Sequence, residues 1–217
     1  MNKQKEQTLQ RRNIIAGLGI AAAGAAAVMP AHAQQPQAFT PTRHDLDAWL
    51  DELPGRHRIF IDSSSTSGGS DATRYAFNLY NAQSNAYAGS DADLAMIVCF
   101  RHGSTAYGYN NLIWEKYGEH LARLMQSQNQ TPTTNPLNPA RGGITIDALA
   151  ARGTHFAICE TATRLITSQV ANAAGANANE VYEEVKANGI PNSHFVSAGV
   201  MAVTRSQEYG YSLLSAG

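Results

Sequence analysis

The sequence predicts an α/β protein of three layers (α/β/α), in which helices cover both faces of a mostly parallel sheet of four or five strands. Short apolar runs of strand length alternate along the chain with stretches of helical spacing, which is the pattern of right-handed βαβ units. One run, 93–100 (DLAMIVCF), is continuously apolar, as expected of a parallel strand covered on both faces. No internal repeat interrupts this alternation.

The first 33 residues, 1–33, have the features of an export signal. Arg11 and Arg12 precede an apolar run rich in Ala and Gly, 14–29, and a small-x-small cleavage site ends at Ala33. This pattern resembles a twin-arginine signal peptide, so we expect a periplasmic or otherwise extracytoplasmic location. A retained anchor is the alternative, although the run is short for a membrane span. We expect no membrane span after cleavage.

Composition places limits on the rest of the chain. Of 217 residues, 184 follow residue 33, enough for one domain with a sizeable core. The segment 1–33 holds four of the 16 basic and one of the 17 acidic residues, which leaves 12 and 16, a net charge of −4. That balance gives no basis for a nucleic-acid partner. Two cysteines, Cys99 and Cys159, are too few for a disulfide framework.

Two regions follow the signal: an N-terminal extension, 34–56, and the α/β domain, 57–217. In the extension, apolar residues from Leu46 to Leu53 repeat with helical spacing, so a short helix is expected at 45–53. The domain begins with a strand at 57–62. A Ser- and Gly-rich loop then leads into a helix of about 17 residues from Asp71.

The middle of the domain is expected to continue the alternation. After the strand at 93–100, helical segments are expected over 107–126, with an interruption near Gly118. Residues 127–143 have no periodicity and contain three prolines, which predicts a long surface excursion. The remaining expected elements are a helix at 145–152, a strand at 155–158, helices at 161–173 and 179–188, a strand at 193–197 and a helix at 200–209.

Cys159 is the first candidate site residue. It lies between the strand at 155–158 and the helix that follows, and ligands of open α/β sheets bind at this edge. A helix N-terminus beside a thiol favours the thiolate, so Cys159 could be a nucleophile. The alternative is a small buried hydrophobic residue, since free cysteine is among the most buried residue types.

His102 is the second candidate. It follows the strand at 93–100, and a flavodoxin-like strand order, 2-1-3-4, would bring it into one cleft with Cys159 and the strand end at Asp62. There it would serve as general base, hydrogen-bond donor or partner of a thiolate. The alternative is a polar residue in a strand-end turn. Arg101 would either hold an anion there or be solvated.

Cys99 lies within the continuously apolar run 93–100, so it is expected to be an inert packing residue. The flavodoxin-like strand order also predicts its distance from Cys159. The first strand would separate the strands of Cys99 and Cys159, which places the thiols about 9 to 10 Å apart laterally. An unstrained disulfide requires Cα atoms within about 7 Å, so no bridge between them is expected.

Other ligand signals are weak. The loop SSSTSGGSD lacks the lysine of a P-loop, so it is either an oxyanion cradle or a plain flexible loop. The histidines are scattered, without a His-x-His or Cys-x-x-Cys pair, so no metal site is expected, and no cofactor is predicted. Three aromatic residues could wall a ligand pocket, bridge subunits or pack in the core: Tyr107, Tyr109 and Trp114.

Three segments together resemble the DsrE/DsrF-like family, which includes sulfur-relay subunits. They are the strand end near His102-Gly103, the strand end at Cys159 after Ala151-Arg152-Gly153, and the closing block 196–211 (VSAGVMAVTRSQEYGY). The resemblance implies a doubly covered parallel sheet, homo-oligomers that are trimers or hexamers, and a persulfide carried on Cys159. The export signal and the inserted 127–143 segment set this chain apart from the cytoplasmic relay proteins.

Two functions follow from this reading. The first is an exported sulfur-handling or thiol-redox protein, with sulfurtransferase-like activity at Cys159 and a sulfur-donor or sulfur-acceptor protein, or a small ligand, as its partner. The second is a non-catalytic module on the same fold that binds a small ligand or serves in oligomeric assembly.

Overall fold

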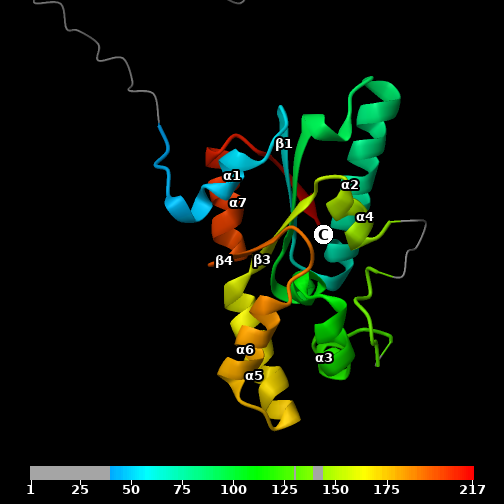
Figure 1. Ribbon diagram of the computed structural model, residues 1–217, viewed down its shortest axis with the longest axis vertical. Coiled ribbons are helices and arrows are strands. Elements are labelled where there is room, and N and C mark those ends of the chain that lie inside the picture. The colour runs from blue at the N-terminus through cyan, green and yellow to red at the C-terminus, as the bar shows by residue number, and fades with distance from the viewer. Residues whose placement is uncertain (1–39, 130, 139–143) are drawn as a thin grey trace, which may run out of the picture. The chain divides into compact units, whose positions relative to one another are not determined.

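Five parallel strands form one sheet at the centre of the fold, in the order β4-β3-β2-β1-β5 (Figure 1). The computed structural model describes residues 40–129, 131–138 and 144–217, of which 41–217 belong to one compact unit. The expected export signal, 1–33, lies outside the described residues. The strands are β1 (His57–Ser63), β2 (Leu94–Phe100), β3 (His155–Cys159), β4 (Ser193–Val196) and β5 (Ser212–Ala216).

Helices cover both faces of this sheet, so the three-layer prediction is confirmed. One face carries α2 (Thr66–Ala86), α3 (Asn111–Leu124), α4 (Ile146–Ala151), α5 (Glu160–Ala174) and α6 (Ala178–Ala187), and the other carries α1 (Trp49–Glu52) and α7 (Gly199–Glu208). Figure 1 shows α1 and α7 on one side of the strands and α2 and α4 on the other. Short 3-10 helices lie at Asp45–Asp47, Asp91–Asp93 and His102–Gly108.

Each face has its own apolar core. Alternate residues of a strand point to opposite faces. In β2, Met96, Val98 and Phe100 belong to the larger cluster under α2 to α6, while Ile97 and Cys99 belong to the smaller cluster under α1 and α7. All seven residues of β2 are buried, as its continuously apolar sequence predicts.

The flavodoxin-like strand order was wrong. From β1 to β4, each new strand is added next to the preceding one, and the connecting helices all cross the same face of the sheet. The chain then returns through α7 across the opposite face, and β5 pairs with the free edge of β1. Right-handed crossovers that run in opposite directions put their helices on opposite faces, which explains the single helix α7 on its side. Strand β5 was not singled out from the sequence, because SLLSA is short and four of its five residues are exposed.

Three helix boundaries also differ from the prediction. The first long helix begins at Thr66 rather than near Asp71, because Ser65 accepts a hydrogen bond from the Gly68 backbone N–H and caps it there. The expected helix at 45–53 is instead a 3-10 turn followed by the four-residue α1. Helix α3 continues through Gly118, where a Cβ atom would lie 1.8 Å from the Pro132 backbone oxygen. Close approach of another segment, not a break, therefore explains this glycine.

The three aromatic residues that could wall a pocket are core residues. Tyr107, Tyr109 and Trp114 are all buried in the larger cluster. The aperiodic 127–143 segment is tied to this core where it is described. Asn135 is fully buried, and its amide donates to the backbone oxygens of Tyr107 and Tyr109 at 2.8 Å each.

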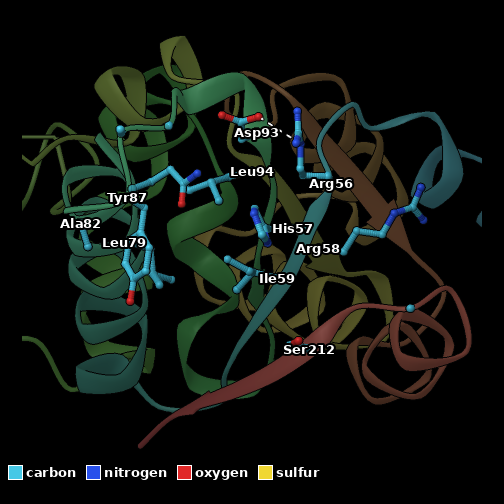
Figure 2. A pocket seen from close by; sticks show the side chains of 14 residues that line it. Arg56, His57, Arg58, Ile59, Leu79, Ala82, Tyr87, Asp93, Leu94 and Ser212 are labelled. Carbon is cyan, nitrogen blue, oxygen red and sulfur yellow. Dashed lines mark ion pairs between the residues drawn. The ribbon is translucent and has the colours of Figure 1, made fainter. Parts of the chain in front are cut away.

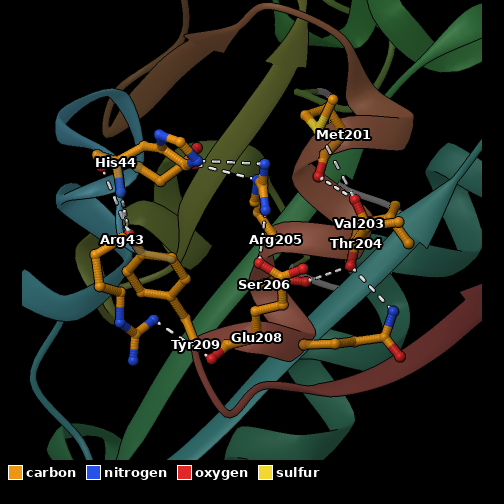
Figure 3. A network of polar contacts seen from close by, with 11 residues as sticks. Arg43, His44, Met201, Val203, Thr204, Arg205, Ser206, Glu208 and Tyr209 are labelled. Carbon is orange, nitrogen blue, oxygen red and sulfur yellow. Dashed lines mark hydrogen bonds and ion pairs between the residues drawn. The ribbon is translucent and has the colours of Figure 1, made fainter. Parts of the chain in front are cut away.

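A polar network joins the segment ahead of α1 to α7 (Figure 3). The Arg43 guanidinium lies 3.7 Å from the centroid of the Tyr209 ring, and Arg205 Nη2 lies 3.4 Å from His44 Nε2. Arg205 also donates to the Glu208 carboxylate at 2.7 Å. These contacts hold the start of the compact unit against the helix that covers the smaller core. None of the described helices is long and apolar enough to cross a membrane.

Candidate functional site

The carboxyl ends of β1, β2 and β3 bring three polar side chains together on the α7 side of the sheet. Asp62 is the next-to-last residue of β1, Arg101 follows the last residue of β2, and Cys159 ends β3. Because the strands are parallel neighbours, these ends lie at one edge. Cys99 of β2 is opposite Asp62 of β1 and Ala157 of β3 in the sheet register. Because alternate residues of a strand share a face, Asp62, Arg101 and Cys159 all lie on the same face as Cys99.

Cys159 occupies the junction of β3 and α5. It is the N-cap of α5, and its Sγ accepts a hydrogen bond from the Ala162 backbone N–H at 3.4 Å. The first turn of a helix has unpaired backbone N–H groups and a partial positive charge, and both favour a thiolate over a thiol. Cys159 is only 5% exposed, so a reaction partner reaches it only when part of its cover moves.

Arg101 and Asp62 form the charged part of the site. Arg101 Nε and Nη2 each donate to one oxygen of the Asp62 carboxylate, both at 2.8 Å. Their side chains are 20% and 10% exposed, so the pair is largely shielded from water. The hydrogen bonds with Asp62 raise the pKa of Arg101 above its usual value, and negative charge on Cys99 or Cys159 adds to this rise.

His102 is connected to this group through Arg101. Arg101 Nη1 lies 3.0 Å from His102 Nδ1. Because a guanidinium only donates, Nδ1 is the acceptor, and the proton of the neutral ring is on Nε2. In this geometry His102 can donate a hydrogen bond but has no free lone pair to act as a general base. The ring itself lines a small apolar cavity of about 210 Å³ between α3 and α5.

The backbone at His102 has an unusual conformation. Its φ of 50° is in the left-handed region, which is sparsely populated by residues other than glycine. The chain turns here from β2 into the 3-10 helix His102–Gly108. Because His102 lies in this turn and not in β2, the alternation of strand side chains that places Arg101 and Cys159 on one face does not determine where His102 points.

The start of α7 closes the site. A Cβ atom on Gly199 would lie 2.6 Å from the Arg101 Cβ, so a glycine is needed for α7 to approach Arg101 this closely. Thr161 Oγ1 in the first turn of α5 donates to the Ser197 backbone oxygen just before α7, at 2.8 Å. The loop between β4 and α7 is therefore fastened to the helix that Cys159 caps.

Cys99 is a packing residue, as predicted, but the predicted separation from Cys159 was wrong. Strands β2 and β3 are neighbours, and Cys99 pairs with Ala157, two residues before Cys159. A residue on one strand and the residue two positions along the neighbouring strand have Cα atoms about 8 Å apart, so the Cα atoms of Cys99 and Cys159 are too far apart for an unstrained disulfide. Both cysteines are free. Complete burial raises the pKa of the Cys99 thiol well above its usual value, so this thiol is unreactive.

The loop SSSTSGGSD is neither a flexible loop nor an open oxyanion cradle. Most of it is the first turns of α2, and Ser65 Oγ donates to the Gly217 backbone oxygen at 2.8 Å. The direction in which strands are added reverses between β1 and β5. The Gly217 backbone oxygen lies there against Gly68 in the first turn of α2, where an oxyanion would otherwise bind. Within the described residues, no three His, Cys, Asp or Glu side chains are grouped in a way that could hold a metal ion.

Sequence reasoning found Cys159 and His102 but assigned no role to Asp62 beyond its strand end. The sequence did contain a signal for this pair. Asp62 ends the first apolar run and Arg101 follows the second, so the two side chains can form an ion pair if the two strands are neighbours in the sheet. The wrong strand order did not affect this pair, since β1 and β2 are adjacent in both orders. Comparison of the chain with models of known protein families found no match, and comparison with curated proteins found none either.

Proposed function

We propose that this chain is an exported sulfur-handling or thiol-redox protein, similar to the DsrE/DsrF-like proteins, that acts through Cys159. The observation that supports this most is the position of the thiol. Cys159 ends a central parallel strand, caps α5 and lies on the same face as the Arg101 cation. A helix N-terminus and a nearby cation are both features that activate a cysteine.

The proposed reaction is sulfur transfer from a persulfide. The Cys159 thiolate attacks the outer sulfur of a donor R–S–S–H, and the S–S bond of the donor breaks. Cys159–S–S–H forms and R–S⁻ leaves, so atoms and charge balance without a further oxidant or reductant. The acceptor takes the outer sulfur by the reverse of this exchange.

The neighbouring side chains have separate roles in this proposal. Arg101 favours the attacking thiolate and then the persulfide anion, and Asp62 fixes the guanidinium by two hydrogen bonds. His102 contributes Nε2–H as a donor at the rim rather than a general base. Arg101 and His102 act through position and charge, and Cys159 is the catalytic residue.

The partners in this proposal are a sulfur-donor or sulfur-acceptor protein, or a small thiol compound. Export by a twin-arginine signal would place them outside the cytoplasm. A homo-oligomer, trimer or hexamer, belongs to the same proposal through the family resemblance.

The burial of Cys159 favours a second candidate, a binding module without catalysis. The thiol is 5% exposed and does not line the cavity of about 830 Å³ at the amino-terminal edge of the sheet. In that case Cys159 serves as a helix cap and packing residue on a fold that holds a small ligand elsewhere.

Mass spectrometry with alkylation distinguishes the two candidates. The mature protein, isolated from its native compartment, is trapped with an alkylating agent and analysed by peptide, and Cys159→Ala and Cys99→Ala are analysed in parallel. We expect 32 mass units of added sulfur on the Cys159 peptide, retained in Cys99→Ala. If Cys159 carries no sulfur and is alkylated only after denaturation, the sulfur-handling proposal fails and the binding module takes its place.

A further inference from the structure

A cavity lies at the amino-terminal edge of the sheet, away from Cys159. It measures about 830 Å³ and is bounded by the start of β1, the last turns of α2, the loop after α2 and the start of β5 (Figure 2). Along β1, Ile59 in the cavity wall lies three residues before Asp62, about 10 Å at the rise of a strand, and the two side chains point to opposite faces of the sheet. A ligand here would not contact the proposed sulfur site.

Part of the cavity wall is apolar, and Gln83 and Ser212 line other parts of it. Ile59 of β1, Leu79 and Ala82 of α2, and Leu94 of β2 line the apolar part, and Figure 2 shows Leu79 and Ile59 projecting toward the same space. Tyr87, in the loop after α2, lies at the mouth with 76% of its surface exposed. An exposed aromatic ring beside an apolar wall is a typical contact for the body of an organic ligand.

The polar part of the lining is basic. Arg56 has its side chain 79% exposed, and its ion pair is the single loose contact of Nε with Asp93 Oδ1 at 3.4 Å. Its terminal guanidinium nitrogens and the ring of the adjacent His57 make no hydrogen bond to another described residue, although both Arg56 and His57 act electrostatically on Asp93. Both side chains therefore have donors that remain available to a ligand at the cavity.

Asp93 does not cancel this basic character. Its Oδ2 accepts from the Ser90 backbone N–H at 2.8 Å and from the Ser90 hydroxyl at 3.2 Å, which closes a capping box. The backbone hydrogen bond from Ser90 lowers the pKa of Asp93, and this carboxylate is already used in the local fold. Arg58 lines the cavity too, but its guanidinium is directed to Asp51, 3.1 Å away, and to the Tyr209 backbone oxygen.

We propose that this cavity binds a small organic anion with an apolar or aromatic body. The carboxylate or sulfonate of the ligand meets Arg56 and His57, and its body packs on Ile59 and Leu79 beneath Tyr87. An anion is selected over a cation because both oxygens of the one carboxylate in the lining have partners, Oδ2 the Ser90 N–H and Oδ1 the Arg56 Nε. The terminal nitrogens of Arg56 remain available as donors. An apolar body is selected because Ile59, Leu79, Ala82 and Leu94 offer carbon surface beside the charges.

Two fluorescent probes of nearly identical shape test this proposal. The first is 8-anilinonaphthalene-1-sulfonate, which carries one negative charge, and the second is N-phenyl-1-naphthylamine, which has the same rings without the sulfonate. Each is titrated into the folded protein at neutral pH. We expect saturable binding of the sulfonate, and about tenfold weaker binding in Arg56→Gln with the neutral probe unchanged.

Three further variants locate the site. Tyr87→Ser should weaken both probes severalfold, since it removes the aromatic contact that they share. Arg123→Gln should change neither, because Arg123 is 61% exposed, pairs with Glu119 and lies on α3. Cys159→Ala should also leave both affinities unchanged, which separates this site from the proposed sulfur chemistry.

The proposal is overturned if the sulfonate does not bind saturably, or if Arg56→Gln binds it as tightly as the unaltered protein. Equal weakening in Arg56→Gln and Arg123→Gln would overturn it as well, because a general effect of surface charge would then account for the binding. Circular dichroism of each variant verifies that the fold is retained. Arg56→Lys provides a second check, and we expect it to keep most of the affinity because it keeps the charge.

Discussion

Arg101 holds Asp62 by two hydrogen bonds of 2.8 Å that link the ends of β2 and β1. The pair lies on the face where β3 delivers Cys159, with the start of α7 packed directly against Arg101. A carboxylate so placed neutralises a cation that would otherwise be poorly solvated, and it also fixes the direction of that cation. The ion pair is therefore both a structural contact and the electrostatic environment of the candidate site.

Replacement of Arg101 by Gln should lower both stability and thiol reactivity. It leaves the Asp62 carboxylate shielded from water without its partner, and we expect the free energy of unfolding to fall by about 2 kcal/mol. Loss of the cation should also slow alkylation of Cys159 at neutral pH severalfold. Urea unfolding and the alkylation rate measure the two effects.

The double variant Asp62→Asn with Arg101→Gln is the matched control. It removes both charges, so it should regain part of the lost stability while alkylation of Cys159 remains slow. Full recovery of the alkylation rate in the double variant would show that Arg101 acts on Cys159 only through the fold.

Gly199→Ala tests the contact between α7 and Arg101. The added methyl group would meet the Arg101 Cβ at 2.6 Å, so either α7 or Arg101 must shift. We expect a loss of about 2 kcal/mol, within the range for overpacked sites. Val200→Ala, in the same turn and exposed, should change the free energy of unfolding by less than about 0.5 kcal/mol. Similar effects of the two substitutions would contradict the packing argument.

A pair of histidines should make the stability depend on pH. His155 Nδ1 lies 2.9 Å from His194 Nε2, and the Trp49 ring is stacked on His194 with centroids 4.1 Å apart. Burial lowers the pKa of His155. Burial, with a smaller contribution from His155, lowers the pKa of His194 to about 4. The unfolded chain therefore binds protons more readily than the folded one.

The sign of the effect follows from these lowered values. The stabilisation is complete above the unfolded pKa of about 6.5 and is lost as the pH falls toward about 4. We expect about 1 kcal/mol from His194 between pH 7.5 and 5, after allowance for solvent screening of a half-buried ring. Urea unfolding at both pH values should show a smaller difference for His194→Gln than for the unaltered protein. The exposed His57→Asn should keep the full difference.

The export signal is tested independently of the fold. Replacement of Arg11 and Arg12 by Lys should retain the precursor in the cytoplasm, because the twin arginines are the recognised feature of this signal. Cell fractionation with an antibody to the mature chain measures it, and the N-terminal sequence of the exported form should begin at Gln34. Unchanged export of the double Lys variant would contradict the assignment.

The sequence by itself determined the fold class and most of the elements. Apolar runs at β1, β2 and β3 are signals within a few neighbouring residues, as are the Thr145 cap and the strand-to-helix junction at Cys159. Local signals also placed Cys159 and Arg101 at strand ends. Only the tertiary structure decided the strand order, the fifth strand and the pairing of Arg101 with Asp62. These depend on which strands become neighbours, and that is set by crossovers packing against a common sheet rather than by any local stretch. The basic cavity at the opposite edge has the same origin, since its lining comes from β1, α2, β2 and β5, segments that become neighbours only in the folded chain.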